Sequence, residues 1–152
     1  MRNSISRNIL SIFTALVLFA ALLAVGAEAR SSRSLVVNVP FDFHVAGKTL
    51  PAGQYIVERT TQASADGLSL RSVDKDMGVF VLTSTVQSNW RQHKSRLVFN
   101  RYQDKYFLSQ LWTSGEASGR ELIKSDSERA ASREIAKTGA KPERVAIIVT
   151  QK

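Results

Sequence analysis

The strongest constraint on this fold is an alternation of apolar and polar side chains between Leu35 and Val45. Apolar residues stand at every second position of this stretch, and most positions between them are polar. Successive side chains of a strand point to opposite faces, so this period predicts extended chain with one buried face. Because Pro40 has no amide hydrogen for a ladder, we expect one strand to end near Val39 and another to run over residues 41–45.

Further short apolar runs follow, separated by residues that favour turns, such as Pro51 and Gly53. We expect strands there over residues 54–60, 68–73, 79–85, 96–102, 106–113 and 145–150. Short strands at this spacing are typical of antiparallel β proteins. The sequence therefore predicts a mainly β fold, a small antiparallel β-barrel or sandwich of about seven to eight strands.

One short helix is predicted before the last strand. Ser125 and Glu128 have the spacing of a capping box, in which the serine oxygen and the glutamate satisfy each other's free amides. Residues 128–137 favour helix, and Gly139 can take the left-handed position that closes it. Since residues 106–113 are apolar on both faces, we expect a central strand there that the helix covers on one side. The helix should pack loosely, because its apolar face consists mainly of Ala130, Ala131 and Ile135.

The first 29 residues have the three parts of a secretory signal. Two arginines precede an apolar stretch at residues 9–25, and Ala27 and Ala29 give the small-x-small pattern that signal peptidase accepts. The alternative is an uncleaved anchor, but the apolar stretch is shorter than the ~20 residues of a spanning helix. We expect a signal helix, cleavage after Ala29, and a single β-rich domain over residues 30–152. That domain is predicted to be secreted or periplasmic, and to meet the membrane only through the signal segment.

Composition limits the chemistry that is open to this domain. The chain has no cysteine, which excludes disulfides and a lipidated cysteine, and its two histidines, His44 and His93, cannot form a multi-histidine metal site. The net charge of the chain is +8, of which +1 lies in the first 29 residues. A basic exported protein attracts anionic partners, although a charge of this size also serves solubility alone.

No catalytic, metal-binding or cofactor-binding residue is predicted. A G-x-S-x-G nucleophile turn and glycine-rich phosphate loops are both missing. Residues 74–76 suggest a hairpin turn rather than a calcium loop, since the other ligands are absent at the required spacing. A pair of carboxylates for glycoside cleavage would meet only in space, which leaves Asp42, Glu58 and Asp104 open as candidates.

The most concentrated functional feature is a basic segment at residues 90–105, which contains aromatic side chains and a single acid, Asp104. Basic residues that alternate with aromatics bind polyanions or sugars through charge and stacking. The alternative is a hairpin with core aromatics and solvated arginines. Export makes nucleic acid an unsuitable partner. The candidate contacts for an anion or a glycan are Trp90, Arg91, Lys94, Arg96, Arg101 and Lys105.

Three stretches carry a resemblance: VPFDFHVAGKTLPAGQY at residues 39–55, RLVFNRYQDKYFLSQLW at 96–112 and GRELIKS at 119–125, with ERAASRE soon after. Together they resemble a family of small exported hypothetical proteins of Acidobacteria-like soil bacteria. The resemblance implies a shared β-rich fold and transfers no catalytic residue or function. Most of its residues are turn formers and core aromatics. Three polar exceptions could pair with one another, cap the helix or meet a ligand: Arg120, Glu121 and Lys124.

Three functional hypotheses remain. The first is a non-enzymatic binding or envelope-associated module whose partner is an anionic envelope polymer or another envelope protein. The second is a structural or protein-interaction component of the envelope, and the third is a hydrolase of envelope polymers. An open, ligand-sized barrel interior would favour small-ligand binding. Small-ligand binding would be excluded by an interior filled with four aromatic side chains: Phe41, Phe43, Phe99 and Trp112. An outer-membrane barrel is disfavoured, because its strands need about 9 to 11 residues.

Overall fold

The structure, a computed structural model, describes residues 34–62 and 65–149. The predicted signal segment and its cleavage point lie outside these residues. Within them the chain forms strands and one helix in the order β1 (Ser34–Val39), β2 (Phe43–Val45), β3 (Lys48–Leu50), β4 (Gly53–Gln62), β5 (Ala65–Ser72), β6 (Gly78–Gln87), β7 (Arg96–Tyr102), β8 (Lys105–Trp112), β9 (Ser118–Leu122), α2 (Asp126–Lys137) and β10 (Glu143–Ile148).

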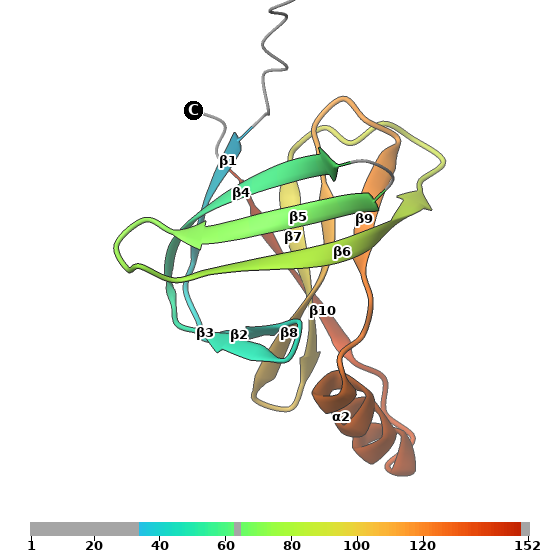
Figure 1. The fold of residues 1–152 in the computed structure, drawn as a ribbon. Coiled ribbons are helices and arrows are strands. Elements are labelled where there is room, and N and C mark those ends of the chain that lie inside the picture. The colour runs from blue at the N-terminus through green and yellow to red at the C-terminus, as the bar shows by residue number, and fades with distance from the viewer. Residues whose placement is uncertain (1–33, 63–64, 150–152) are drawn as a thin grey trace, which may run out of the picture. The chain divides into compact units, whose positions relative to one another are not determined.

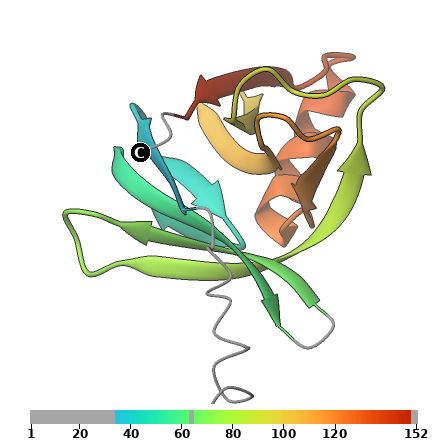
Figure 2. The ribbon, with the colours of Figure 1, turned by 90° about the horizontal axis from the view of Figure 1, so that it is seen from above.

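The strands form two sheets that share β6. In the first sheet β1, β4, β5 and β6 are neighbours in that order, and every pair is antiparallel. The first half of β6 pairs with β5 and its second half pairs with β9, so β6 passes from one sheet to the other. Its curvature is visible from above (Figure 2). The second sheet continues through β9, β8, β7 and β10 (Figure 1).

The short hairpin β2–β3 joins the second sheet at β8. β2 pairs with β8 in parallel through Phe43↔Tyr106 and His44↔Phe107, and with β3 in antiparallel fashion. Pro40 lies between β1 and β2, as predicted for a residue that cannot donate to a ladder. β1 and β10, the outer strands of the two sheets, do not pair with each other within the described residues.

The prediction of a mainly β fold with one short helix before the last strand is confirmed. The sheet is open, so a closed barrel is not confirmed. Ten strands lie in the described part of the chain, against the predicted seven to eight. β3 was missed because its three residues lie among turn formers, and β9 because Gly119 and Glu121 have low β propensity.

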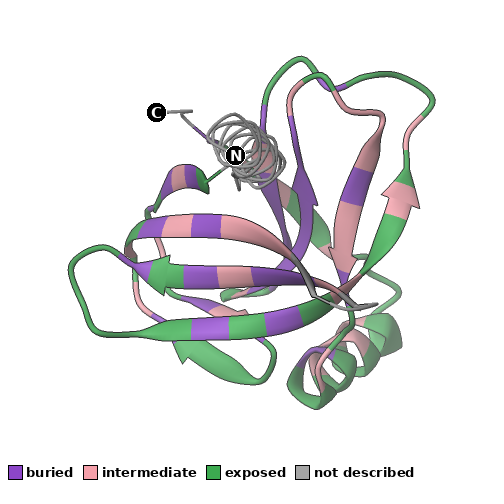
Figure 3. Cartoon of the chain, turned by 45° about the horizontal axis from the view of Figure 1, so that its top comes forward, coloured by how far each residue is buried: buried purple, intermediate pink, exposed green. Residues whose placement is uncertain are grey.

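The core lies between the two sheets and follows the predicted alternation (Figure 3). Phe43 and Phe99 are fully buried there, with ring centroids 5.4 Å apart. Phe41 packs against the core, edge-on to Phe99 at 5.3 Å. Trp112 belongs to the opposite face of β8, because it pairs with Arg96 while the core residues Leu97 and Leu111 form the next pair. Aromatic side chains, together with the leucines and valines of the core, therefore fill the interior.

β8 is buried on both faces from Phe107 to Trp112, as predicted for a central strand. The helix packs against β7, the neighbour of β8, and most of its residues are exposed (Figure 3). Ser125 caps it by accepting a hydrogen bond from the Glu128 amide at 3.2 Å, and Gly139 closes it with a φ of 72°. Among the described helices, none is both long and apolar enough to cross a membrane.

The Glu128 side chain departs from the predicted capping box. It is buried at 4 % exposure and accepts hydrogen bonds from Asn100 Nδ2 at 2.9 Å and from the Tyr102 hydroxyl at 3.3 Å. The carboxylate thus ties the first turn of α2 to β7, and only the serine half of the box is made. A charged group at this depth is stable because two donors and the helix N-terminus satisfy it.

Candidate functional site

The six predicted contact residues divide into two groups at opposite ends of β7. Trp90, Arg91 and Lys94 lie in the connection before this strand, and Arg96 is its first residue. Arg101 and Lys105 lie at its far end, beside the turn into β8. Five residues of extended chain separate the two arginines by about 16 Å and place them on opposite faces. The structure therefore does not bring the six residues into one site.

The first group lies on a loop that is held firmly in place. This tip loop, residues 88–95, forms backbone hydrogen bonds with the loop between β8 and β9. Gln92 and Gly115 donate in opposite directions, Gln92 N to Glu116 O at 2.9 Å and Gly115 N to Gln92 O at 2.8 Å. Ser88 N donates to Ala117 O at 2.8 Å. These bonds fix the backbone of the tip loop against a second loop.

The aromatic and charged side chains of the tip loop are open to solvent, whereas Gln92 and Ser95 are buried. Trp90 is 73 % exposed, the highest value among the large apolar residues of the described chain. Arg91 donates to the carbonyl of Gly115 at 3.0 Å, which uses one of its five N–H donors. Lys94 is exposed and forms no ion pair with a described residue. Arg96 is half-buried on the outer face of β7, opposite Trp112.

The second group is already occupied by intramolecular contacts. Arg101 pairs with Glu143 of β10 at 3.1 Å, donates to Gln103 O at 2.8 Å and lies 5.5 Å from the ring centroid of Tyr106. Lys105 is exposed and lines a groove between the hairpin and the helix. Arg101 thus holds the edge strand β10, and Lys105 belongs to a separate surface.

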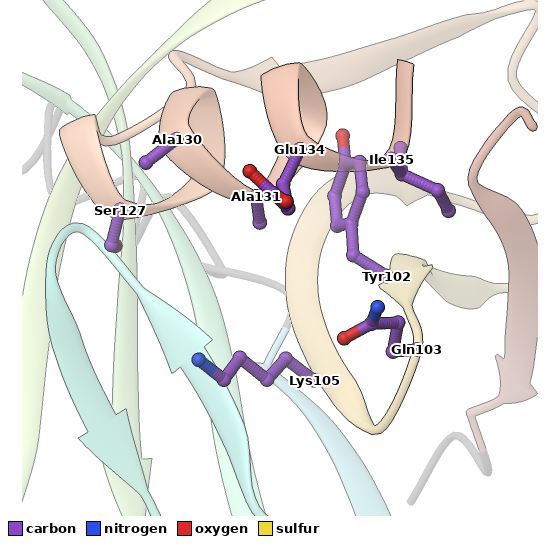
Figure 4. Close-up of a pocket in the computed structure, with 8 residues that line it drawn as sticks. All are labelled: Tyr102, Gln103, Lys105, Ser127, Ala130, Ala131, Glu134 and Ile135. Carbon is purple, nitrogen blue, oxygen red and sulfur yellow. The ribbon is translucent and has the colours of Figure 1, made fainter. Parts of the chain in front are cut away.

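The helix groove, with a volume of about 420 Å³, lies between α2 and the β7–β8 turn (Figure 4). The helix contributes its thin apolar face, and the hairpin contributes Tyr102, Gln103 and Lys105, which face the helix across the gap. The apolar face therefore covers little of the sheet. This agrees with the predicted loose packing, since Glu128 makes the main polar attachment of the helix. The helical lining consists of Ser127, Ala130, Ala131, Glu134 and Ile135.

A second cavity, which we call the outer groove, was missed by the sequence analysis. It has a volume of about 440 Å³ and lies on the outer face of the second sheet. Its residues come from five strands and two connections, and only residues 121–124 are consecutive in the sequence, so no local motif predicts the whole groove. The lining consists of Ser84, Asn100, Ser109, Glu121, Leu122, Ile123, Lys124, Pro142 and Arg144.

The three polar exceptions of the GRELIKS stretch have different roles. Arg120 pairs with Asp66 and donates to Thr85 Oγ1 at 2.8 Å, which joins β9 to β5 and β6. Glu121 accepts from Gln110 Nε2 at 3.0 Å and lines the outer groove. The side chain of Lys124 also lines that groove. One of the three is therefore structural, and two lie at a cavity.

Neither histidine lies in a catalytic arrangement. The ring of His44 stacks on Phe107 with centroids 4.7 Å apart, and its Nδ1 lies 3.0 Å from the Thr49 hydroxyl. His93 is exposed in the tip loop, where its carbonyl accepts from Ser114 Oγ at 3.0 Å. Within residues 34–62 and 65–149, no three His, Cys, Asp or Glu side chains gather in a way that would hold a metal ion.

The comparisons with known proteins returned no relative. No family model, no curated protein and no solved structure matches this chain. The resemblance drawn from the sequence stretches above therefore stays a prediction.

Proposed function

We propose that this chain is an exported, non-enzymatic binding module that contacts an anionic glycan of the cell envelope through the tip loop. The observation that carries the proposal is Trp90, which is 73 % exposed on a loop with a fixed backbone. Three cations lie within six residues of it along the chain: Arg91, Lys94 and Arg96.

An exposed tryptophan is available for contact, because burying its large ring against a partner gains the apolar burial that solvent exposure forgoes. Aromatic side chains on rigid supports are effective contact residues, since little conformational entropy is lost when they bind. An indole presents a flat apolar face to the C–H face of a sugar ring, and neighbouring cations attract carboxylates or phosphates. The composition of the tip loop therefore suits an acidic polysaccharide.

The filled interior supports an external site over an internal one. Phe43 and Phe99 are fully buried between the sheets, and the two grooves described above both open on the outside of the sheets. A lipocalin-like cavity would need this space to be free. We therefore propose surface contacts as the means of binding.

The direct experiment measures binding of the protein, exported by a bacterial host, to polygalacturonate and to neutral dextran. We expect binding to polygalacturonate only, weakened by added salt, and at least about tenfold weaker in Trp90→Ala. Phe80→Ala is the matched control, because Phe80 is also an exposed aromatic, 54 %, but lies on β6 of the first sheet. Equal binding by Trp90→Ala and the unaltered protein would refute the proposal.

The protein-interaction alternative has one specific observation in its favour. Phe80 and Leu82 are each 54 % exposed and lie on the same face of β6, two residues apart. Adjacent exposed apolar side chains mark interaction surfaces more often than scattered ones do. If the partner is a second copy of the chain, sedimentation should give a dimer that Phe80→Ser with Leu82→Ser converts to a monomer. A monomer at all concentrations would exclude this form of the alternative.

A further inference from the structure

The floor of the outer groove contains a polar side chain without a partner. Ser109 is 8 % exposed and lines the groove, and its hydroxyl bonds to no described residue. It is the extra residue of a β-bulge, because β7 pairs Val98 with Gln110 and Phe99 with Leu108, which leaves Ser109 without a cross-strand neighbour. Bulges redirect a side chain and often lie next to functional sites. A nearly buried, unpartnered hydroxyl at a cavity is available to a ligand.

Two further floor residues are held in position by the protein. Asn100 is 6 % exposed, and its Nδ2 donates to Glu128, which leaves its carbonyl oxygen as a further acceptor. Glu121 is fixed by Gln110, whose Nε2 donates to it, while Gln110 Oε1 accepts from Trp112 Nε1 at 3.1 Å. The floor thus offers a hydroxyl, an amide oxygen and a carboxylate, a set that suits the hydroxyl groups of a sugar.

The rim of the outer groove is positive. Lys124 and Arg144 both line it, both are exposed, and neither forms an ion pair within the described part of the chain. Glu121 is the one acid among its lining residues, so the lining carries a net charge of +1. An unpaired arginine beside a cavity offers a planar pair of donors that matches a carboxylate. The rim therefore favours an acidic ligand over a neutral one.

The volume of about 440 Å³ lies within the range of roughly 300–1,000 Å³ that small-molecule sites occupy. The helix groove has a similar volume but a different lining. Its alanines and isoleucine are apolar, and Glu134 already pairs with Lys137 at 3.0 Å. The nearly buried Ser109 hydroxyl distinguishes the outer groove from the helix groove, whose Gln103 and Lys105 are exposed, and makes it the better site for a polar ligand.

We propose that the outer groove binds one acidic sugar residue, with its carboxylate against Arg144 and Lys124 and its hydroxyls on Ser109, Asn100 and Glu121. The choice of a sugar acid rests on the proposed glycan-binding function, but the site shares no residue with the tip loop. Arg96 and Asn100 lie on the same face of β7, about 13 Å apart along the strand. An acidic glycan along β7 would therefore contact the outer groove, Arg96 and the tip loop in turn.

Calorimetric titration of the protein with D-galacturonate, D-galactose and acetate tests the proposal. The acid should bind, and galactose, which lacks the carboxylate, should bind at least about tenfold more weakly. Acetate, which lacks the hydroxyls, should not bind measurably. A free sugar acid and the end of a polymer share this chemistry, so a galacturonate trimer is titrated as well. A trimer that binds more tightly identifies a polymer end, and equal affinity identifies the free acid.

Variants separate this site from the tip loop. Arg144→Gln with Lys124→Gln should abolish the preference for galacturonate over galactose, and Ser109→Ala should weaken both sugars by a common factor. Trp90→Ala should leave binding of the monosaccharide unchanged. Binding of galacturonate without binding of polygalacturonate would sustain the outer groove and refute the tip loop. Acetate affinity equal to that of galacturonate, or full binding by the Arg144 and Lys124 double variant with a native circular dichroism spectrum, would overturn the proposal.

Discussion

The two sheets differ in what their outer faces do. On the first sheet the outer face is open, and Phe80 and Leu82 of β6 are each 54 % exposed. On the second sheet the outer face is buried at β7 and β8, with Val98 at 7 %, Gln110 at 5 % and Trp112 at 7 % exposure, while Ile148 at the edge strand β10 is 59 % exposed. The same chain thus builds a first sheet with a single buried face and a second sheet whose central strands, β7 and β8, are buried on both faces (Figure 3). A sheet that is buried on both sides must satisfy polar groups on the side away from the core.

The difference in burial between the two outer faces explains where hydrogen-bonded networks of side chains lie. Trp112, Gln110 and Glu121 form one chain on the outer face of the second sheet, and Asn100 and Tyr102 bond to Glu128 nearby. Each of these groups would be costly to bury without a partner. The outer face of the second sheet is therefore specified by polar pairing as well as by packing, and it is also the face that carries the outer groove.

The largest difference in stability should come from truncating one phenylalanine in the core and one on the outer face of the first sheet. Phe99→Ala removes a fully buried ring that contacts Phe41 and Phe43, and should lower the free energy of unfolding by about 3–5 kcal/mol. Phe80→Ala removes a ring that is 54 % exposed and should cost about 0.5 kcal/mol. Urea unfolding followed by circular dichroism measures both. Similar losses for the two variants would contradict the assignment of the core face.

Two glycines, one beside a buried ring of the second sheet and one beside an exposed ring of the first sheet, test the same difference between the outer faces. A Cβ at Gly119 would lie 2.8 Å from the ring of Trp112 and 2.9 Å from Leu111 O, and the buried ring cannot move freely. Gly119→Ala should therefore cost about 1–3 kcal/mol. A Cβ at Gly67 would also meet a ring, that of Phe80, but this side chain is exposed and can rotate into solvent. Gly67→Ala should cost less than about 1 kcal/mol. Chemical denaturation of the two variants in parallel checks the order, and a larger loss at Gly67 would show that Phe80 is held in place.

The sequence predicted the first sheet better than the outer face of the second. Alternation in β1 and β4 reports one buried face, and turn formers mark the ends of these strands, so local pattern was sufficient. β9 was missed because its SGREL sequence is stable as a strand only through pairing with β6 and β8 on either side. Tertiary pairing of this kind overrides propensity and leaves no local signal.

Contacts between distant segments also decide where the predicted contact residues lie. Trp90, Arg91, Lys94 and Arg96 are close in sequence and stay at one end of β7, whereas Arg101 is drawn to Glu143, which is distant in the chain. The sequence could not show that pairing. The outer groove combines residues from β6 to β10, and Glu128, predicted to cap its own helix, instead bonds to β7. Contacts between distant segments decided each of these outcomes.

Glu128 tests whether polar pairing holds the helix on the second sheet. Glu128→Ala leaves the buried Asn100 amide and Tyr102 hydroxyl without their acceptor, and should cost about 1–3 kcal/mol. Glu134→Ala is the control on the same helix, since its exposed pair with Lys137 contributes less than about 0.5 kcal/mol. Hydrogen exchange of the α2 amides should accelerate in the first variant and not in the second. Unchanged exchange in Glu128→Ala would mean that packing alone holds the helix.

The smallest effect concerns a buried polar group of the first sheet, Tyr55, whose hydroxyl donates to Pro51 O at 2.6 Å. Burial, and secondarily the charge of Asp42, raises the pKa of Tyr55 above its ordinary value of about 10. The folded state then holds this proton more tightly than the unfolded state, so the contribution to stability is complete below about pH 10 and is lost as the pH rises through the folded-state pKa. Tyr55→Phe should cost about 0.5–1.5 kcal/mol at neutral pH through loss of the hydrogen bond. The difference in unfolding free energy between the unaltered protein and Tyr55→Phe should decrease above about pH 10. In an Asp42→Asn background this decrease should be complete at a lower pH, because the carboxylate charge that raises the pKa of Tyr55 is absent. Unfolding free energies of the unaltered protein and Tyr55→Phe are measured from neutral pH to above about pH 10. A constant difference between them would show that Tyr55 has the same pKa in the folded and unfolded states.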